Sequence, residues 1–103
     1  MSTLAPVLDT DTETKGKFDK KWLIVFLNDD KTPYEFVMML IMEVFKKNQE
    51  DAYNITKQIN DEGSGIVFTG SLELAEMKYQ MVNDICKTNI FAKHFKYDLR
   101  SDE

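Results

Sequence analysis

The stretch that decides the fold is Trp22-Leu23-Ile24-Val25-Phe26-Leu27-Asn28-Asp29-Asp30-Lys31-Thr32-Pro33-Tyr34-Glu35-Phe36-Val37. Its first six residues are apolar and include β-branched and aromatic side chains, which predicts a buried strand. Thr32, Pro33 and Glu35 then have the spacing of a capping box. Thr32 is the expected N-cap, Pro33 the first helical residue, and Glu35 reaches back. An amide and two carboxylates therefore lie on a short turn at the edge of an apolar core.

Two helices are predicted after this turn. The first, over about 33–47, is apolar on nearly every side, so it either lies at the centre of the core or leaves one face open to a groove. The second begins at Asn48, a favourable N-cap, and ends at Gly63, a favourable C-terminal stop. Its inward stripe has helical spacing and consists of Ala52, Ile55 and Ile59.

The last third of the chain predicts a strand, a helix and a final strand. Residues 66–68 form a short apolar run, and Gly70-Ser71 opens a third helix. The apolar stripe of this helix consists of Leu72, Ala75, Tyr79, Val82 and Cys86. From Phe91 the pattern alternates every two residues, which predicts a last strand with Phe91, Phe95, Tyr97 and Leu99 on one face and His94 on the polar face.

The predicted fold class is therefore α+β, a three-stranded antiparallel sheet packed against three helices in the order β-α-α-β-α-β. Residues 21–103 form the core domain. Residues 1–20 are polar with alternating charges, so we expect a flexible N-terminal extension.

Composition excludes several classes of protein. The chain has 103 residues and a net charge of −5, which argues against binding to nucleic acid or to an anionic membrane surface. It contains no apolar run long enough to span a membrane. Cys86 is the single cysteine, so no disulfide framework is expected. An intracellular location follows, in the cytoplasm or in an organelle stroma.

The turn suits a ligand that has a cation next to an apolar group. An α-ammonium group has three donors and needs acceptors in a shielded site. The Asn28 side-chain oxygen and the Asp30 carboxylate can each accept a hydrogen bond from one of these donors, while Asp29 reinforces the negative potential. A slot between the first two helices would take the neighbouring side chain. A peptide N-terminus with a bulky first residue fits this description.

A family resemblance agrees with this chemistry. The block Asn28-Asp29-Asp30-x-Thr32-Pro33-x-Glu35-Phe36-Val37, then Gly63, then Leu74-Ala75-Glu76-Met77-Lys78, resembles the ClpS family of Clp-protease adaptors over roughly residues 21–99. The resemblance implies an adaptor that is not an enzyme and needs no cofactor or metal. It would bind N-degron substrates that begin with Phe, Leu, Trp or Tyr. It would deliver them, as a monomer, to the N-terminal domain of a Clp-type AAA+ unfoldase.

The same resemblance assigns roles to individual residues. Asn28, Asp30 and Asn60 match the family's amine-binding set. The wall of the hydrophobic pocket is matched by Thr32, Tyr34, Val37, Thr56 and Ile59. On the third helix, Glu73 and Lys78 correspond to the surface that binds the unfoldase.

Three of these positions depart from the family pattern. Asn60 stands where a histidine is usual, and Tyr34 and Thr56 stand where methionine is common. These departures leave open an alternative function, in which the protein binds and regulates the unfoldase with a lost or altered N-degron pocket. An enzyme using Asp29 and Asp30 is disfavoured because no nucleophile–base set is visible.

Overall fold

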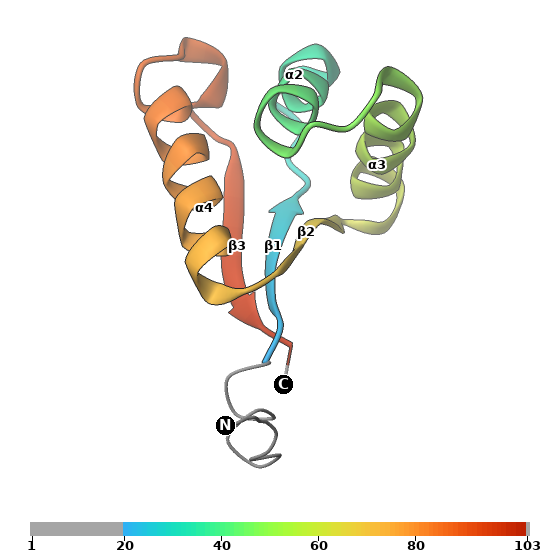
Figure 1. Cartoon of the computed structure of the whole chain (residues 1–103). Helices are drawn as coiled ribbons and strands as arrows, with labels where there is room; N and C mark the ends of the chain where they lie inside the picture. Colours follow the sequence, from blue (N-terminus) through green and yellow to red (C-terminus); the bar gives the residue numbers. More distant parts are fainter. Residues whose placement is uncertain (1–19, 103) are drawn as a thin grey trace, which may run out of the picture.

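The apolar run Trp22–Leu27 forms the central strand, β1, of a sheet in the order β2-β1-β3. The computed structural model describes residues 20–102. Strand β2, Ser64–Gly70, and strand β3, Lys96–Ser101, both pair with β1 in the antiparallel direction (Figure 1). The predicted extension, apart from its last residue, lies outside the described residues.

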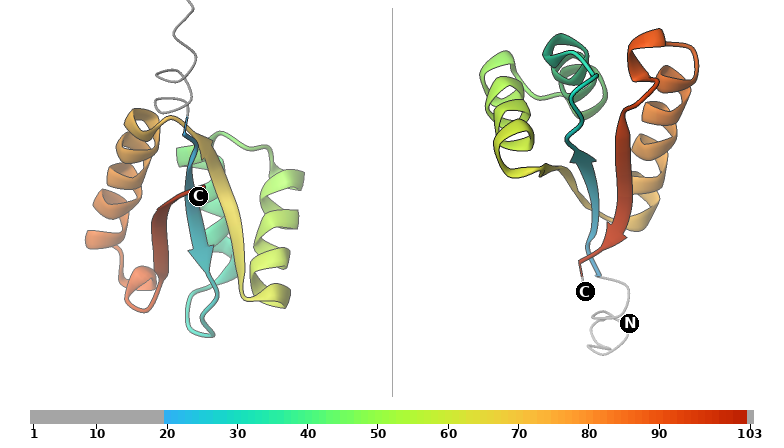
Figure 2. Two further views of the ribbon diagram at one scale, coloured as in Figure 1. Left: turned by 90° about the horizontal axis from the view of Figure 1, so that it is seen from below. Right: turned by 180° about the vertical axis from the view of Figure 1, so that it is seen from behind.

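Three α-helices complete the fold: α2, Tyr34–Phe45; α3, Gln49–Glu62; and α4, Leu72–Lys87. A short 3₁₀ helix, η1, spans Ile90–Ala92 before β3. The helices of residues 20–102 lie on one face of the sheet, and Figure 2 shows none of them over the other face. The predicted class and the order β-α-α-β-α-β are confirmed.

The core lies between β1 and the helices. Ile24 and Phe26 on β1 are completely buried, as are Leu40 and Ile41 on α2. The ring of Phe26 packs edge-on against Phe95, with ring centroids 4.9 Å apart. Burial of side chains of this size stabilises the fold by roughly 1.5–3 kcal/mol each. This packing fixes the end of β1, where the polar turn begins.

Helix ends agree with the sequence at three positions. The Asn48 side chain accepts from the Asp51 N–H, and the Ser71 side chain accepts from the Leu74 N–H. Gly63 ends α3 in the left-handed conformation, with φ of 95°. Such a φ favours a residue without Cβ.

The predicted capping box at the start of α2 is wrong. Pro33 is the N-cap residue, with no side-chain cap hydrogen bond, and the helix begins at Tyr34. The Thr32 hydroxyl donates instead to the Asp29 carboxylate, at 2.7 Å. A charged carboxylate is a strong competing acceptor for a hydroxyl, so the threonine stabilises the turn rather than the helix. The helix also ends at Phe45, before the predicted end.

The prediction for the segment before β3 is also wrong in part. Phe91 lies in η1 and is 56% exposed, and the strand begins at Lys96. The Asn89 side chain accepts from the Phe91 N–H at 2.9 Å, which caps a helical turn. His94 consequently lies in a turn rather than on the polar face of a strand.

Two predicted stripes and one strand need smaller corrections. On α3, Ala52 and Ile59 are buried, but Thr56 is buried more completely than Ile55. On α4, Leu72 is the first residue of the helix and is 39% exposed, so it does not belong to the buried stripe. Strand β2 is longer than predicted and has an irregular register opposite Ile24 and Val25.

Candidate functional site

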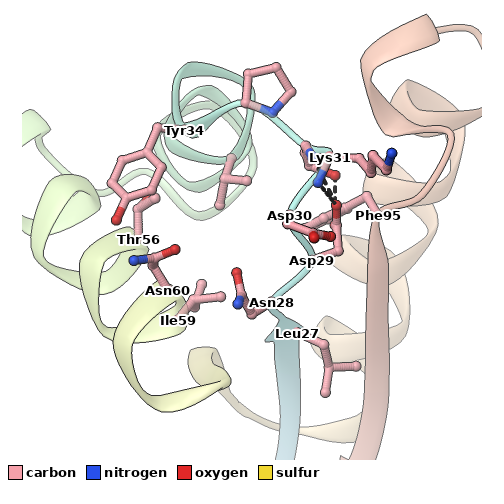
Figure 3. Close-up of a pocket in the computed structure, with 13 residues that line it drawn as sticks. Leu27, Asn28, Asp29, Asp30, Lys31, Tyr34, Thr56, Ile59, Asn60 and Phe95 are labelled. Carbon is pink, nitrogen blue, oxygen red and sulfur yellow. Dashed lines mark hydrogen bonds between the residues drawn. The ribbon is translucent and has the colours of Figure 1, made fainter.

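A hollow of about 410 Å³ opens where β1 runs into the turn (Figure 3). Residues 27–33 form one wall, and α3 forms the opposite wall. The first turns of α2 close the hollow above, and Phe95 contributes from the segment before β3. All of the residues expected for the amine site and for the pocket line this hollow: Asn28, Asp29, Asp30, Thr32, Tyr34, Val37, Thr56, Ile59 and Asn60.

Asp29 organises the turn. Its carboxylate accepts from the backbone N–H of Lys31 and of Thr32, both at 2.8 Å, and from the Thr32 hydroxyl. Both oxygens are therefore used within the turn. Partial burial opposes the charged form, but these hydrogen bonds outweigh it, so the pKa of Asp29 lies below its usual value. The turn is most stable when Asp29 is charged.

Asp30, the next residue, has a different environment. It is exposed on the same turn and lines the hollow. No hydrogen bond or ion pair of its carboxylate occurs within residues 20–102. Two neighbouring carboxylates thus differ in role, since Asp29 is occupied by the turn while Asp30 keeps its acceptor capacity for a ligand.

Two amide side chains face each other across the hollow, Asn28 from the turn and Asn60 from α3 (Figure 3). The Asn28 backbone N–H donates to the Gly63 carbonyl at 2.9 Å, so the turn is tied to the end of the helix that carries Asn60. The Asn60 side-chain nitrogen donates to Asp61 at 3.3 Å. Its side-chain oxygen is therefore left as an acceptor on the hollow.

The deeper walls are apolar. Val37, Thr56 and Ile59 are each at most 7% exposed, while Tyr34 is 36% exposed and its ring points toward α3 (Figure 3). The Thr56 hydroxyl donates to the Ala52 carbonyl at 2.7 Å, so its hydrogen is used within the helix. This wall is consequently less polar than its threonine suggests.

Sequence reasoning missed four of the lining residues: Leu27, Lys31, Pro33 and Phe95. Phe95 is buried against Phe26 and Phe36, whose ring centroids lie 4.9 and 6.2 Å away. Its apolar character predicted a core residue, but its place beside the turn depends on the path of the chain between α4 and β3. No local signal in the sequence indicates that path.

The comparisons with known proteins agree with this geometry. Residues 17–96 match the family model described as "ATP-dependent Clp protease adaptor protein ClpS". The chain belongs to the ClpS family. Its members are adaptors of the ATP-dependent Clp protease, and the turn and hollow of this ClpS protein lie within the matched residues.

Individual relatives cover most of the chain. The ClpS adapter protein of Bdellovibrio bacteriovorus is 36% identical over 86 residues, which are 84% of this chain and 68% of that protein. The ClpS adapter protein of Nautilia profundicola is 37% identical over 82 residues, 80% of this chain and 78% of the relative. The structure resembles that of Agrobacterium tumefaciens ClpS2 bound to L-phenylalaninamide, with a TM-score of 0.68 and 27% identity. The match covers 80% of this chain and 99% of that one.

The two residues expected to bind the unfoldase lie on α4 of this ClpS protein. Glu73 is exposed in the first turn, where a negative charge favours the helix dipole. Lys78 donates to the Val44 carbonyl at 2.9 Å, near the end of α2. Lys78 therefore joins two helices, in addition to any contact that it makes with a partner.

Within residues 20–102, no group of histidine, cysteine and acidic side chains is arranged to hold a metal ion. In the same part of the chain, no helix is long and apolar enough to cross a membrane.

Proposed function

We propose that this protein binds the free α-amino group and the bulky first side chain of N-degron substrates, and delivers them to a Clp-type AAA+ unfoldase. The observation that carries the proposal is the hollow itself. It combines the free carboxylate of Asp30 and two amide oxygens at its rim with an apolar interior. The similar ClpS2 of Agrobacterium tumefaciens is bound to L-phenylalaninamide, a molecule with a free amine and an aromatic side chain.

The two halves of such a ligand would contact different residues. The ammonium group would donate to the Asp30 carboxylate and to the side-chain oxygens of Asn28 and Asn60, with Asp29 adding negative potential. Its three donors match these three acceptors. The first side chain would enter the slot between Val37 and Ile59, where burial contributes roughly 1.5–3 kcal/mol. Tyr34 would cover it from the solvent side.

Fluorescence anisotropy with short peptides tests the proposal. Peptides beginning with Phe, Leu, Trp, Tyr, Met, Ile or Ala are measured with a free and with an acetylated N-terminus. We expect binding of the bulky members, and loss of binding on acetylation because the charged donor is removed. No binding of any free peptide to a folded sample would contradict the proposal and favour the regulator without cargo.

Delivery needs a separate measurement on the unfoldase N-terminal domain. Glu73→Lys should weaken that contact without lowering the melting temperature more than its control. Glu50→Lys is the matched control because Glu50 also lies in the first turn of a helix, on α3. Equal affinities of the two variants would remove Glu73 from the contact.

A further inference from the structure

A second hollow, of about 380 Å³, lies on the other side of the same turn. It shares Asp29, Asp30 and Lys31 with the first hollow, and Phe95 lies beside both. Its remaining lining comes from the segment before β3 and is basic: Lys93, His94 and Lys96. A lysine-rich depression therefore adjoins the amine site, in a protein whose net charge is −5.

The backbone that carries these lysines is held in place. Phe95, between Lys93 and Lys96, is 8% exposed and packs on Phe26. The Lys31 N–H donates to the Asp29 carboxylate at 2.8 Å. The positive charges thus sit on fixed segments, so their attraction for a ligand does not require ordering of the backbone.

The positive charges of this depression are only partly offset by the two carboxylates that also line it. Among the described residues, no ion pair involves Lys31, Lys93 or Lys96, whereas Asp98 and Arg100 on β3 pair with each other at 3.1 Å. The three lysines outnumber the two carboxylates of the turn. An ammonium group bound at Asp30 would neutralise one of those carboxylates and leave the depression more positive.

Helix α3, which forms the opposite wall of the first hollow, has a net negative charge. Helix α3 carries four acidic residues and one lysine, and that lysine, Lys57, is paired with Asp61 at 2.8 Å. A ligand with negative charge beyond its amine is therefore attracted toward the segment before β3 and repelled from α3. Asp30 lines both hollows, so this segment lies beside any bound amine.

We propose that the depression formed by Lys31, Lys93, His94 and Lys96 selects N-degron substrates with acidic residues directly after the first residue. The inference rests on the proposed function. An extended peptide advances about 3.3–3.6 Å per residue, so residues two to four lie within roughly 10 Å of the bound first residue, about one screening length. The depression that holds the lysines adjoins this site through Asp30. Exposed pairs of this kind change affinity by about 1.4- to fivefold each.

Three peptides with a free N-terminal Phe and an identical neutral tail test the inference by anisotropy. Their residues two to four are all Ala, all Glu or all Lys. We expect the Glu peptide to bind at least about twofold more tightly than the Ala peptide, and the Lys peptide to bind more weakly. The differences should shrink in about 0.5 M NaCl because the charges are exposed.

The double variant Lys93→Gln and Lys96→Gln should remove most of this preference. The matched control is Lys47→Gln with Lys87→Gln, which deletes the same charge at exposed positions that line neither hollow. Equal affinities of the three peptides, or a preference that the first double variant retains, would overturn the inference while leaving the amine site in place. Failure of all three peptides to bind would overturn the proposed function together with it.

Discussion

The turn of residues 28–33 and helix α3 face each other across the first hollow, but different interactions hold them. The turn is held by polar contacts, the three hydrogen bonds to Asp29 and the bond from Asn28 to Gly63. The wall on α3 is held by burial of Ala52, Thr56 and Ile59. The properties of the polar wall therefore depend on individual charged side chains. Those of the apolar wall depend on the shape of its packed side chains.

The two neighbouring carboxylates of the turn, Asp29 and Asp30, also differ. Asp29 is a structural carboxylate whose two oxygens both accept hydrogen bonds within the turn, whereas no hydrogen bond to the Asp30 carboxylate occurs within residues 20–102. A site that binds a cation needs both kinds, because an unsupported turn would not hold the second carboxylate in position. The substitutions below separate these contributions.

The largest effect is expected from Asp30→Asn. Asp30 is exposed in the free protein and would be covered by the bound peptide. Truncating one partner of a charge pair desolvated in this way typically costs about 2–5 kcal/mol, so affinity for a Phe peptide should fall at least roughly thirtyfold. Asp102→Asn is the control, since Asp102 is exposed at the other end of β1. Both variants should unfold at the temperature of the parent protein. Unchanged peptide affinity of Asp30→Asn would remove this residue from the amine site.

A smaller effect, on both stability and binding, is expected from Asp29→Ala. The loss of three hydrogen bonds on a partly buried turn should lower the free energy of unfolding by about 1–3 kcal/mol, measured in urea. Peptide binding should weaken as well because the turn that carries Asn28 and Asp30 loosens. Asp102→Ala should lower neither the stability nor the affinity for the peptide. A variant as stable as the parent would show that the turn holds without Asp29.

Asp29 also predicts how the stability of the protein depends on pH. The pKa of Asp29 is lowered in the folded state, so its contribution to stability is present above the unfolded value of about 3.9. That contribution is lost as the pH falls through the lower folded value. The stability difference between the parent and Asp29→Ala should therefore narrow below about pH 4. A constant difference down to pH 2 would contradict this role.

The smallest effect tests the apolar wall. A Cβ at Gly65 would lie 2.8 Å from Ile59, so Gly65→Ala must displace this wall residue. We expect a loss of about 1–2 kcal/mol in stability and a lower affinity for Trp peptides relative to Leu peptides. Gly70→Ala is matched, because its Cβ would lie 2.8 Å from Phe68, which does not line the hollow. An identical peptide ranking in both variants would show that Ile59 does not shape the slot.

Local patterns in the sequence predicted most of the secondary structure. The apolar run of β1 and the caps Asn48, Gly63 and Ser71 each depend on neighbouring residues and are confirmed, and the helical stripes are confirmed except at Ile55 and Leu72. The two largest errors, at the start of α2 and in the segment before β3, occurred where two local interactions compete. The Thr32 side chain could cap a helix or donate to Asp29. The segment around Phe91 could form a strand with alternating side chains, or a helical turn capped by Asn89.

The sequence by itself determined the strand–turn–helix unit, the family and the residue types of the candidate site. Only the tertiary structure decided that Asn60 faces Asn28 across the first hollow. It also placed the lysines before β3 beside the turn. The physical reason is range. Capping and periodicity act over a few residues, whereas these placements depend on how β1, α3 and β3 pack around Phe26 and Phe95.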